Sequence, residues 1–319
     1  MAKLPQISFK EAQNHLKELQ AFFKELSTKD VYCSESGFSA DKDAILRVFK
    51  NTSDCKKEDI LVRLTLIDSM YSTQMSRRYY ALDELAEALS ILANNKKGKL
   101  RKMFLAFAKN PEQNLSIFNY NDDRKALTNL FSEYYGIGKN GSDKGIAISL
   151  ISKYAYFETD FNFPIYDSIV CEMYPIVWHF CGFDKNKPKL TYREKGKVIG
   201  DKTMVEYVKA INLIIEKLNS KVLNYNILDR YLWFVGKICR GNLSLILSRS
   251  EYEMALKAFP PKTIVKTNKK GEATESFEYF NIKDMNIESF EFLNCMERKN
   301  IRKFFEIAKV YKEREKSKY

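Results

Sequence analysis

The residue types that can hold a nucleic-acid backbone gather in one glycine-rich segment, which contains Gly136, Gly138, Lys139 and Gly141. Consecutive backbone N–H groups in a tight glycine turn can bind a phosphate oxygen, and the positive end of a following helix strengthens this binding. Such a contact does not depend on the identity of the base. We therefore predict that these four residues contact a nucleic-acid backbone.

Asp167 is the candidate catalytic carboxylate. It lies in the segment Pro-Ile-Tyr-Asp-Ser, directly before an apolar run, where the dipole and N–H groups of a helix would keep a carboxylate ionised. Cleavage of an N-glycosidic bond builds positive charge on the sugar, and a carboxylate can stabilise that charge or activate water or an amine. Aspartate is also common at the N-cap of a helix, so the alternative is that Asp167 is an ordinary cap without a catalytic role.

Lys144 is the candidate amine nucleophile. It begins a helix predicted over 144–157, and a lysine held near Asp167 can attack the sugar C1′ and form a Schiff base. Lys139 and Lys153 compete for this role. Without such an amine, Asp167 would activate water.

Aromatic side chains are available to hold a base that has left the stack. Tyr166 and Trp233 are the candidates for this base pocket. An aromatic residue at helical spacing belongs to the core more often than to a pocket.

Together these segments resemble the helix-hairpin-helix DNA glycosylases of the HhH-GPD type. The family hairpin is matched by Tyr-Gly-Ile-Gly (135–138), the helix after it by Lys-Gly-Ile-Ala (144–147), and the acidic segment by Pro-Ile-Tyr-Asp-Ser-Ile-Val (164–170). Residues 66–74 are similar to the family's apolar helix, which ends in a Gln-containing loop that reaches into DNA. This resemblance implies that Gln74 is a DNA-insertion residue.

The chain departs from the family pattern at several points. Residues 139–143 form an insertion before the helix, Ser168 stands where Thr is usual, and the spacing from Lys144 to Asp167 is slightly long. No four-cysteine cluster follows, which excludes the iron–sulfur branch of the family.

The resemblance implies a DNA glycosylase that excises a damaged or modified base, with or without lyase activity at the resulting abasic site. It also implies a monomer that acts on duplex DNA and needs no cofactor. The alternative is a non-catalytic helical nucleic-acid-binding protein, in which Asp167 only caps a helix.

The composition agrees with a nucleic-acid partner. The formal net charge is +12, which suits a polyanion. No apolar run is long enough to cross a membrane and the start does not look like a signal peptide, so we expect no membrane contact and a cytoplasmic location. Six cysteines without a C-x-x-C pair, and only two histidines, predict no metal site.

The expected fold is mainly α, because Gly and Pro are scarce. We expect an HhH-GPD-like helical bundle with a cleft between two helical halves, plus two short β-hairpins near 189–199 and 263–280. The predicted domains are an N-terminal helical extension (1–56), a glycosylase-like helical domain (57–247), and a C-terminal extension (248–319) with a hairpin and a basic helix. Apolar periodicity predicts helices over 8–28, 41–50, 57–71, 79–93, 122–135, 144–157, 169–180, 201–219 and 226–239.

Overall fold

The structure is a computed structural model, and it divides the chain into two compact units: residues 37–229, and residues 1–36 together with 230–319. The described residues are 17, 21, 38–71, 73–95, 100–121, 127–138, 145–183, 188, 190, 193–194, 197–218, 223–239, 262–267 and 273–278. Most of them are helical, which confirms the mainly α prediction. The predicted helix over 8–28 and the C-terminal basic helix lie almost wholly outside these residues.

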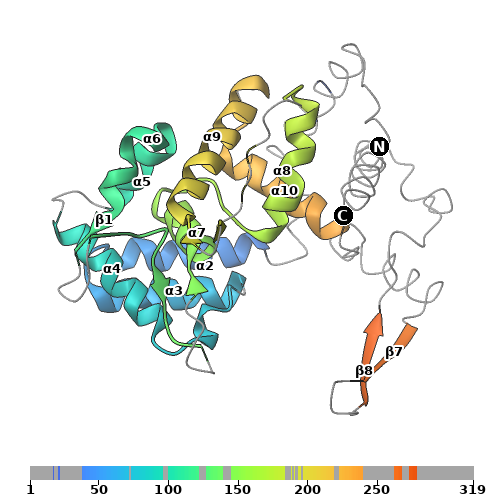
Figure 1. Cartoon of the computed structure of the whole chain (residues 1–319), viewed down its shortest axis with the longest axis horizontal. Coiled ribbons are helices and arrows are strands. Elements are labelled where there is room, and N and C mark those ends of the chain that lie inside the picture. The colour runs from blue at the N-terminus through green and yellow to red at the C-terminus, as the bar shows by residue number, and fades with distance from the viewer. Residues whose placement is uncertain are drawn as a thin grey trace. The chain divides into compact units, whose positions relative to one another are not determined.

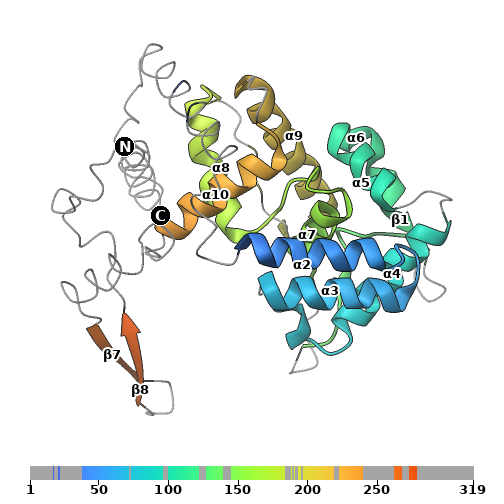
Figure 2. The same ribbon diagram turned by 180° about the vertical axis from the view of Figure 1, so that it is seen from behind.

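The helices of the 37–229 unit follow most of the predicted apolar runs (Figures 1 and 2), but the helix predicted over 144–157 begins only at Ile148, because residues 145–146 form a strand. They are α2 (Phe38–Asn51), α3 (Lys57–Tyr71), α4 (Ala81–Asn95), α5 (Leu100–Lys109), α6 (Pro111–Asn114), α7 (Ile148–Glu158), α8 (Ser168–Phe180) and α9 (Gly200–Leu218), with 3-10 turns η1 (Met75–Arg77) and η2 (Leu115–Phe118). Helix α10 (Tyr225–Cys239) begins in this unit, and its residues from Arg230 onward belong to the other unit.

The strands in the described residues form short antiparallel pairs. These are β1 (Asn119–Tyr120) with β2 (Thr128–Asn129), β3 (Tyr134–Tyr135) with β4 (Gly145–Ile146), β5 (Arg193–Glu194) with β6 (Lys197–Val198), and β7 (Lys262–Thr267) with β8 (Ala273–Glu278). The last two pairs confirm the two predicted hairpins. The pair β7–β8 belongs to the second unit and is in register from Lys262 opposite Glu278 to Thr267 opposite Ala273.

The helix predicted over 122–135 is wrong where the structure describes that segment. Residues 127–135 form turns and two short strands instead. The Asn129 side-chain amide donates to Asn119 Oδ1 at 2.8 Å, and the Leu130 N–H donates to the Phe118 carbonyl at 3.1 Å. These bonds to an earlier part of the chain compete with helix formation and outweigh the apolar spacing of the segment.

Helix α7 is the core of the 37–229 unit. Its residues Ile148 and 150–157 are all buried, and it packs against α2, α3 and α5. A helix that is buried on every side is normally apolar throughout. Ser152 and Lys153 are therefore exceptional, because burial obliges each of them to find a polar partner.

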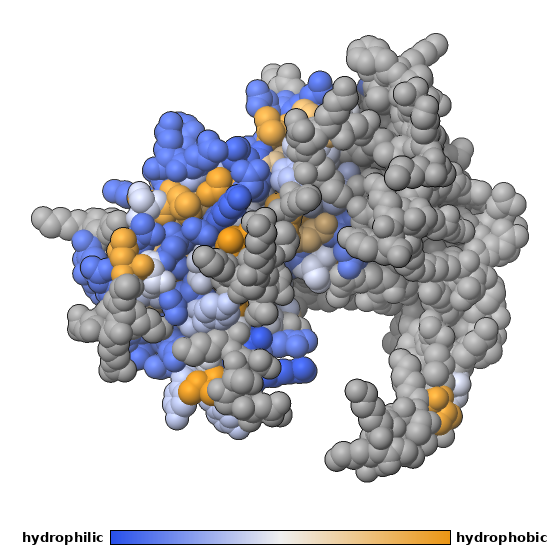
Figure 3. All heavy atoms as spheres, viewed as in Figure 1, coloured by the Kyte–Doolittle hydropathy of each residue, from blue (hydrophilic) through white to orange (hydrophobic). Residues whose placement is uncertain are grey.

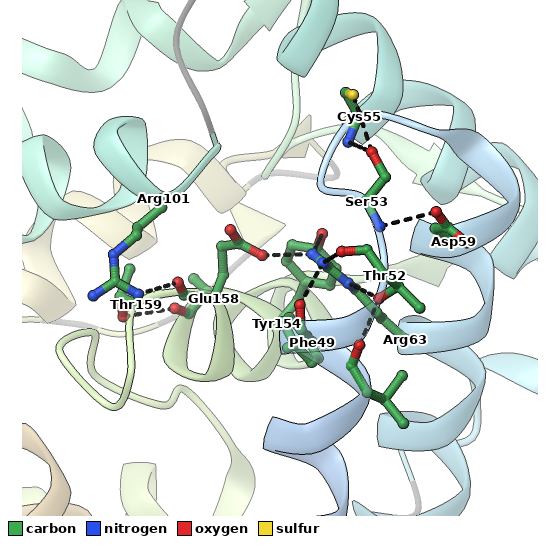
Figure 4. A network of polar contacts seen from close by, with 12 residues as sticks. Phe49, Thr52, Ser53, Cys55, Asp59, Arg63, Arg101, Tyr154, Glu158 and Thr159 are labelled. Carbon is green, nitrogen blue, oxygen red and sulfur yellow. Dashed lines mark hydrogen bonds and ion pairs between the residues drawn. The ribbon is translucent and has the colours of Figure 1, made fainter.

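Helix α2, which we predicted to lie in the 1–56 extension, packs against α3 and α7 inside this unit. A buried arginine, Arg63 on α3, connects these three helices (Figure 4). Its guanidinium donates to the carbonyls of Phe49 and Thr52 near the end of α2, at 2.8 and 2.6 Å, and to Glu158 Oε2 on α7, at 2.7 Å. It also donates to the Tyr154 hydroxyl at 3.2 Å. One side chain thus joins three helices.

Glu158 is nearly buried in this network, with 9% of its side chain exposed. Burial raises its pKa to about 7, while the nearby Arg63 opposes that rise. Arg101 on α5 donates to the Glu158 backbone carbonyl at 3.0 Å and forms an ion pair of 2.7 Å with Asp160, two residues after Glu158. The folded protein is therefore expected to bind a proton at Glu158 more tightly than the unfolded chain does.

This proton predicts a pH dependence of stability. Between about pH 5 and pH 7, the free energy of unfolding of the wild type should fall relative to that of Glu158→Gln, because the folded state must release a proton that the unfolded chain has already lost. The relative change should not exceed about 3 kcal/mol, at roughly 1.4 kcal/mol per pKa unit. Urea unfolding at several pH values measures it.

The control is Thr65→Ala, because the Thr65 hydroxyl is exposed and carries no charge. This variant should keep the pH dependence of the wild type. A wild-type stability that rises toward pH 7 relative to Glu158→Gln would mean that the ion pair with Arg63 outweighs burial, and would contradict the prediction.

Candidate functional site

Asp167 and a lysine do come together, and the lysine that the structure places there is Lys153. Lys153 lies in the middle of α7, and Asp167 directly precedes α8. Lys153 Nζ is 3.4 Å from Asp167 Oδ2; 3% of the lysine side chain and 18% of the aspartate side chain are exposed. The pair is therefore largely shielded from water, with one edge of the carboxylate still accessible.

The two oxygens of Asp167 have different partners. Oδ1 accepts the N–H of Val170 at 2.9 Å, which is the bond of a helix N-cap, and Oδ2 faces Lys153. The Asp167 carbonyl accepts the Cys171 N–H at 2.9 Å and begins the helical bonding of α8. The carboxylate is thereby held in one orientation at the positive end of a helix.

The buried ammonium of Lys153 has partners on several sides. It donates to Ser149 Oγ at 2.9 Å, one turn earlier on α7, and it lies 5.8 Å from the ring centre of Tyr71 at the end of α3. A carboxylate, a hydroxyl and an aromatic face therefore replace the water that the charge loses on burial.

Ser152 sets the distance between the two charged residues. Its fully buried hydroxyl accepts the Tyr166 N–H at 2.9 Å and lies 3.3 Å from the Tyr166 carbonyl oxygen. Ser152 directly precedes Lys153, and Tyr166 directly precedes Asp167. This double contact therefore connects α7 to the start of α8 at the point where the amine and the carboxylate meet.

Tyr166, the predicted base-pocket residue, is buried beside this pair. Its ring meets that of Tyr207 edge-on at 5.2 Å, and its hydroxyl donates to the Leu190 carbonyl at 3.3 Å. Cys171 lies on the same side of α8, and burial raises its pKa to about 12. Its thiol therefore stays protonated near neutral pH and is a poor nucleophile.

The remaining predicted site residues are placed as follows. Trp233 is half-buried on α10, in the other unit. Lys144, Lys139 and Gly141 lie outside the described residues. Gly138 directly follows Ile137, which forms an isolated β-bridge with Tyr79.

Two amides at the start of the glycine-rich segment already have protein acceptors. The Gly136 N–H donates to Glu84 Oε2 at 2.7 Å, and the Ile137 N–H donates to the Tyr79 carbonyl at 3.0 Å. Gly136 has a φ of +74°, and a Cβ there would lie 2.6 Å from the Cβ of Ala81. A phosphate at Gly136 would have to displace the Glu84 carboxylate.

Gln74, the predicted insertion residue, is exposed in a rigid loop. It has a φ of +63° directly before η1. The buried carboxylate of Asp68 on α3 accepts the Thr73 hydroxyl and the N–H groups of Met75 and Ser76, at 2.9 and 3.0 Å. Burial alone would raise the pKa of Asp68, but these hydrogen bonds together lower it.

Sequence reasoning missed Ser152 and Asp68. The available signal was a polar residue inside an otherwise apolar helical run, which predicts a buried hydrogen bond.

Comparison with protein-family models, curated proteins and solved structures found no match. None of the helices in the described ranges combines the length and apolar character needed to cross a bilayer.

The Ser152 contact predicts a large effect on stability. Ser152→Ala should lower the free energy of unfolding by about 1–3 kcal/mol, because it leaves the buried Tyr166 N–H without an acceptor. Ser116→Ala is the matched control, since Ser116 is exposed in η2, and it should cost less. Urea denaturation compares the two variants. An equal loss in both would contradict the role of Ser152 in joining α7 to α8.

Proposed function

We propose that this protein is a DNA glycosylase of the helix-hairpin-helix type, with Asp167 as the catalytic carboxylate and Lys153 as the amine nucleophile. The supporting observation is the 3.4 Å approach of Lys153 Nζ to Asp167 Oδ2 at the start of α8. An amine beside an oriented carboxylate is what a glycosylase of the lyase type needs.

The reaction would begin with loss of a proton from the Lys153 ammonium to Asp167 Oδ2. The neutral amine then attacks C1′ of the sugar, and the N-glycosidic bond breaks with its electron pair leaving on the base. Asp167 returns the proton to the departing base, and its carboxylate then stabilises the positive charge on the sugar. The C1′–O4′ bond then breaks with its electron pair leaving on O4′, O4′ takes up the proton that the attached nitrogen releases, and an iminium forms between Lys153 and C1′. If Lys153 only holds the carboxylate, Asp167 would activate water instead.

Lys153 replaces Lys144 as the proposed nucleophile because its position is fixed by the fold. It lies on the most buried helix of the unit, and the Ser152 contact to Tyr166 holds it next to Asp167. Lys144 remains the alternative that the same experiment tests.

The remaining part of this proposal rests on the resemblance to the family and on the net charge of +12. It comprises a helical bundle with a cleft between two halves and a monomer that binds duplex DNA. In this plan Gln74 inserts into the DNA, and the loop containing Gly138, Lys139 and Gly141 contacts its backbone.

One observation favours a second function. The bond from the Val170 N–H to Asp167 Oδ1 is an ordinary N-cap, and a buried lysine beside it can serve as a structural counter-ion. On this reading the protein is a non-catalytic helical nucleic-acid-binding protein.

Borohydride trapping on duplexes that carry a panel of modified bases separates these functions. The wild type should form a covalent adduct on the right substrate, and Lys153→Arg should abolish it, since a guanidinium keeps the ion pair but cannot form a Schiff base. Asp167→Asn should slow base excision by roughly two to four orders of magnitude. The Asp167→Asn variant should stay folded, because Asn caps a helix about as well as Asp.

Lys42→Arg is the matched control, because Lys42 is also a buried lysine and donates to the Tyr156 hydroxyl at 2.7 Å. It should leave trapping intact. If Lys144→Gln abolishes trapping and Lys153→Arg does not, the nucleophile is Lys144. Full excision activity in Asp167→Asn would remove this carboxylate from the mechanism.

The net charge predicts how DNA binding responds to salt. The logarithm of the affinity should fall linearly with the logarithm of the salt concentration, by about 0.9 for each phosphate neutralised. Fluorescence anisotropy on a labelled duplex, from about 50 to about 200 mM salt, measures this slope. An affinity that stays constant over this range would argue against contact with the phosphate backbone.

A further inference from the structure

Two adjacent tyrosines are strongly exposed just before α4. Tyr79 is 62% and Tyr80 69% exposed, and Ile137, the bridge partner of Tyr79, is 41% exposed. On the face drawn in Figure 3, the described surface is mostly hydrophilic and its apolar side chains occur in small separate groups. Exposed aromatic residues in neighbouring positions are unusual on such a surface and mark contact sites.

The backbone beneath the tyrosines is firmly held. Tyr79 and Ile137 exchange two hydrogen bonds of 3.0 Å, and the Gly136 N–H is bound to Glu84. At the other end of the same segment, Asp68 holds the N–H groups that follow Gln74. The tyrosine side chains therefore project from a preorganised support.

The backbone is also strained at two positions of this segment. Gln74 and Tyr80 have φ values of 63° and 62°, in the left-handed region that non-glycine residues rarely adopt. Such strain persists where surrounding contacts impose it, and it is concentrated at functional sites. Here it directs an exposed tyrosine outward without burying it.

Cations accompany the aromatic surface. Arg77 is exposed, and its guanidinium donates to Gln74 Oε1 at 3.3 Å. The Arg78 guanidinium lies against Gly145, since a Cβ at position 145 would fall 2.2 Å from Arg78 Cζ. This close contact holds the guanidinium next to the segment that carries the two tyrosines.

Acidic residues near the start of α4 have partners of their own. Asp83 and Glu87 both pair with Lys57, at 3.1 and 3.0 Å. Lys57 offsets one of these two negative charges, and Arg77 and Arg78 are the cations next to the tyrosines in the chain.

We propose that Tyr79, Tyr80 and Ile137, together with Arg77, form a binding surface for single-stranded nucleic acid. Bases stack on the two tyrosine rings and Arg77 contacts the phosphate between them. Stacking of this kind tolerates any base, but it needs bases whose faces are open, which the interior of a duplex does not offer. This surface lies next to Gln74, the insertion residue of the proposed function, but binding of single-stranded nucleic acid needs no base excision, so its test is separate from that of the glycosylase.

The test is fluorescence anisotropy of the full-length protein with an unmodified labelled oligothymidylate. Tyr79→Ala should weaken binding roughly five- to hundredfold, which corresponds to the loss of one stacked base. Tyr80→Asn should do the same, and Asn is chosen because it tolerates a left-handed backbone. Tyr79→Phe and Tyr80→Phe should bind within about twofold of the wild type, because the ring that stacks is kept.

Leu213→Ala is the control for loss of an exposed apolar side chain, since Leu213 is 43% exposed on α9. It should bind as the wild type does. Unchanged binding in both tyrosine truncations would overturn the proposal. An equal loss on fully paired duplex DNA would also overturn it, because the surface would then not select open bases. Failure of excision with these binding results intact would reject only the glycosylase.

Discussion

The packing of the 37–229 unit depends on α7, a helix buried on every side that nevertheless carries polar residues. Each of these residues must find its partner inside the protein. Ser152 and Lys153 are consecutive, so their partners, the Tyr166 backbone and the Asp167 carboxylate, are consecutive as well. The hydrogen-bonding demand of α7 therefore determines where α8 begins, and it explains why an amine and a carboxylate meet there.

Toward the C-terminal end of α7, the polar side chains of Tyr154 and Glu158 have a buried arginine, Arg63, as their hydrogen-bond partner. Arg63 bonds to Tyr154 and Glu158 on α7 and to the carbonyls near the end of α2. A buried arginine must be satisfied on all its donors or it destabilises the fold. This requirement holds α2 against α3 and α7 and places Glu158 in the buried network, where burial raises its pKa.

Gly136 and Ile137, at the start of the glycine-rich segment, have a structural role in the fold. Gly136 permits a close approach to Ala81 and delivers its N–H to Glu84, while Ile137 bonds to Tyr79. The segment thus holds the loop of the exposed tyrosines in place. A turn that can bind a phosphate can equally bind a carboxylate from its own chain, and here the carboxylate is provided by α4.

The sequence by itself determined the helices at 57–71, 169–180 and 201–219 and the two hairpins, because apolar periodicity and turn residues are local signals. It also indicated Asp167 as a residue at a helix start. Only the tertiary structure decided that Lys153 is its partner, since that choice depends on how α7 packs rather than on residue type. The strands of 127–135 and the pairing of Gly136 with Glu84 were decided in the same way, because both rest on hydrogen bonds to residues outside the segment itself.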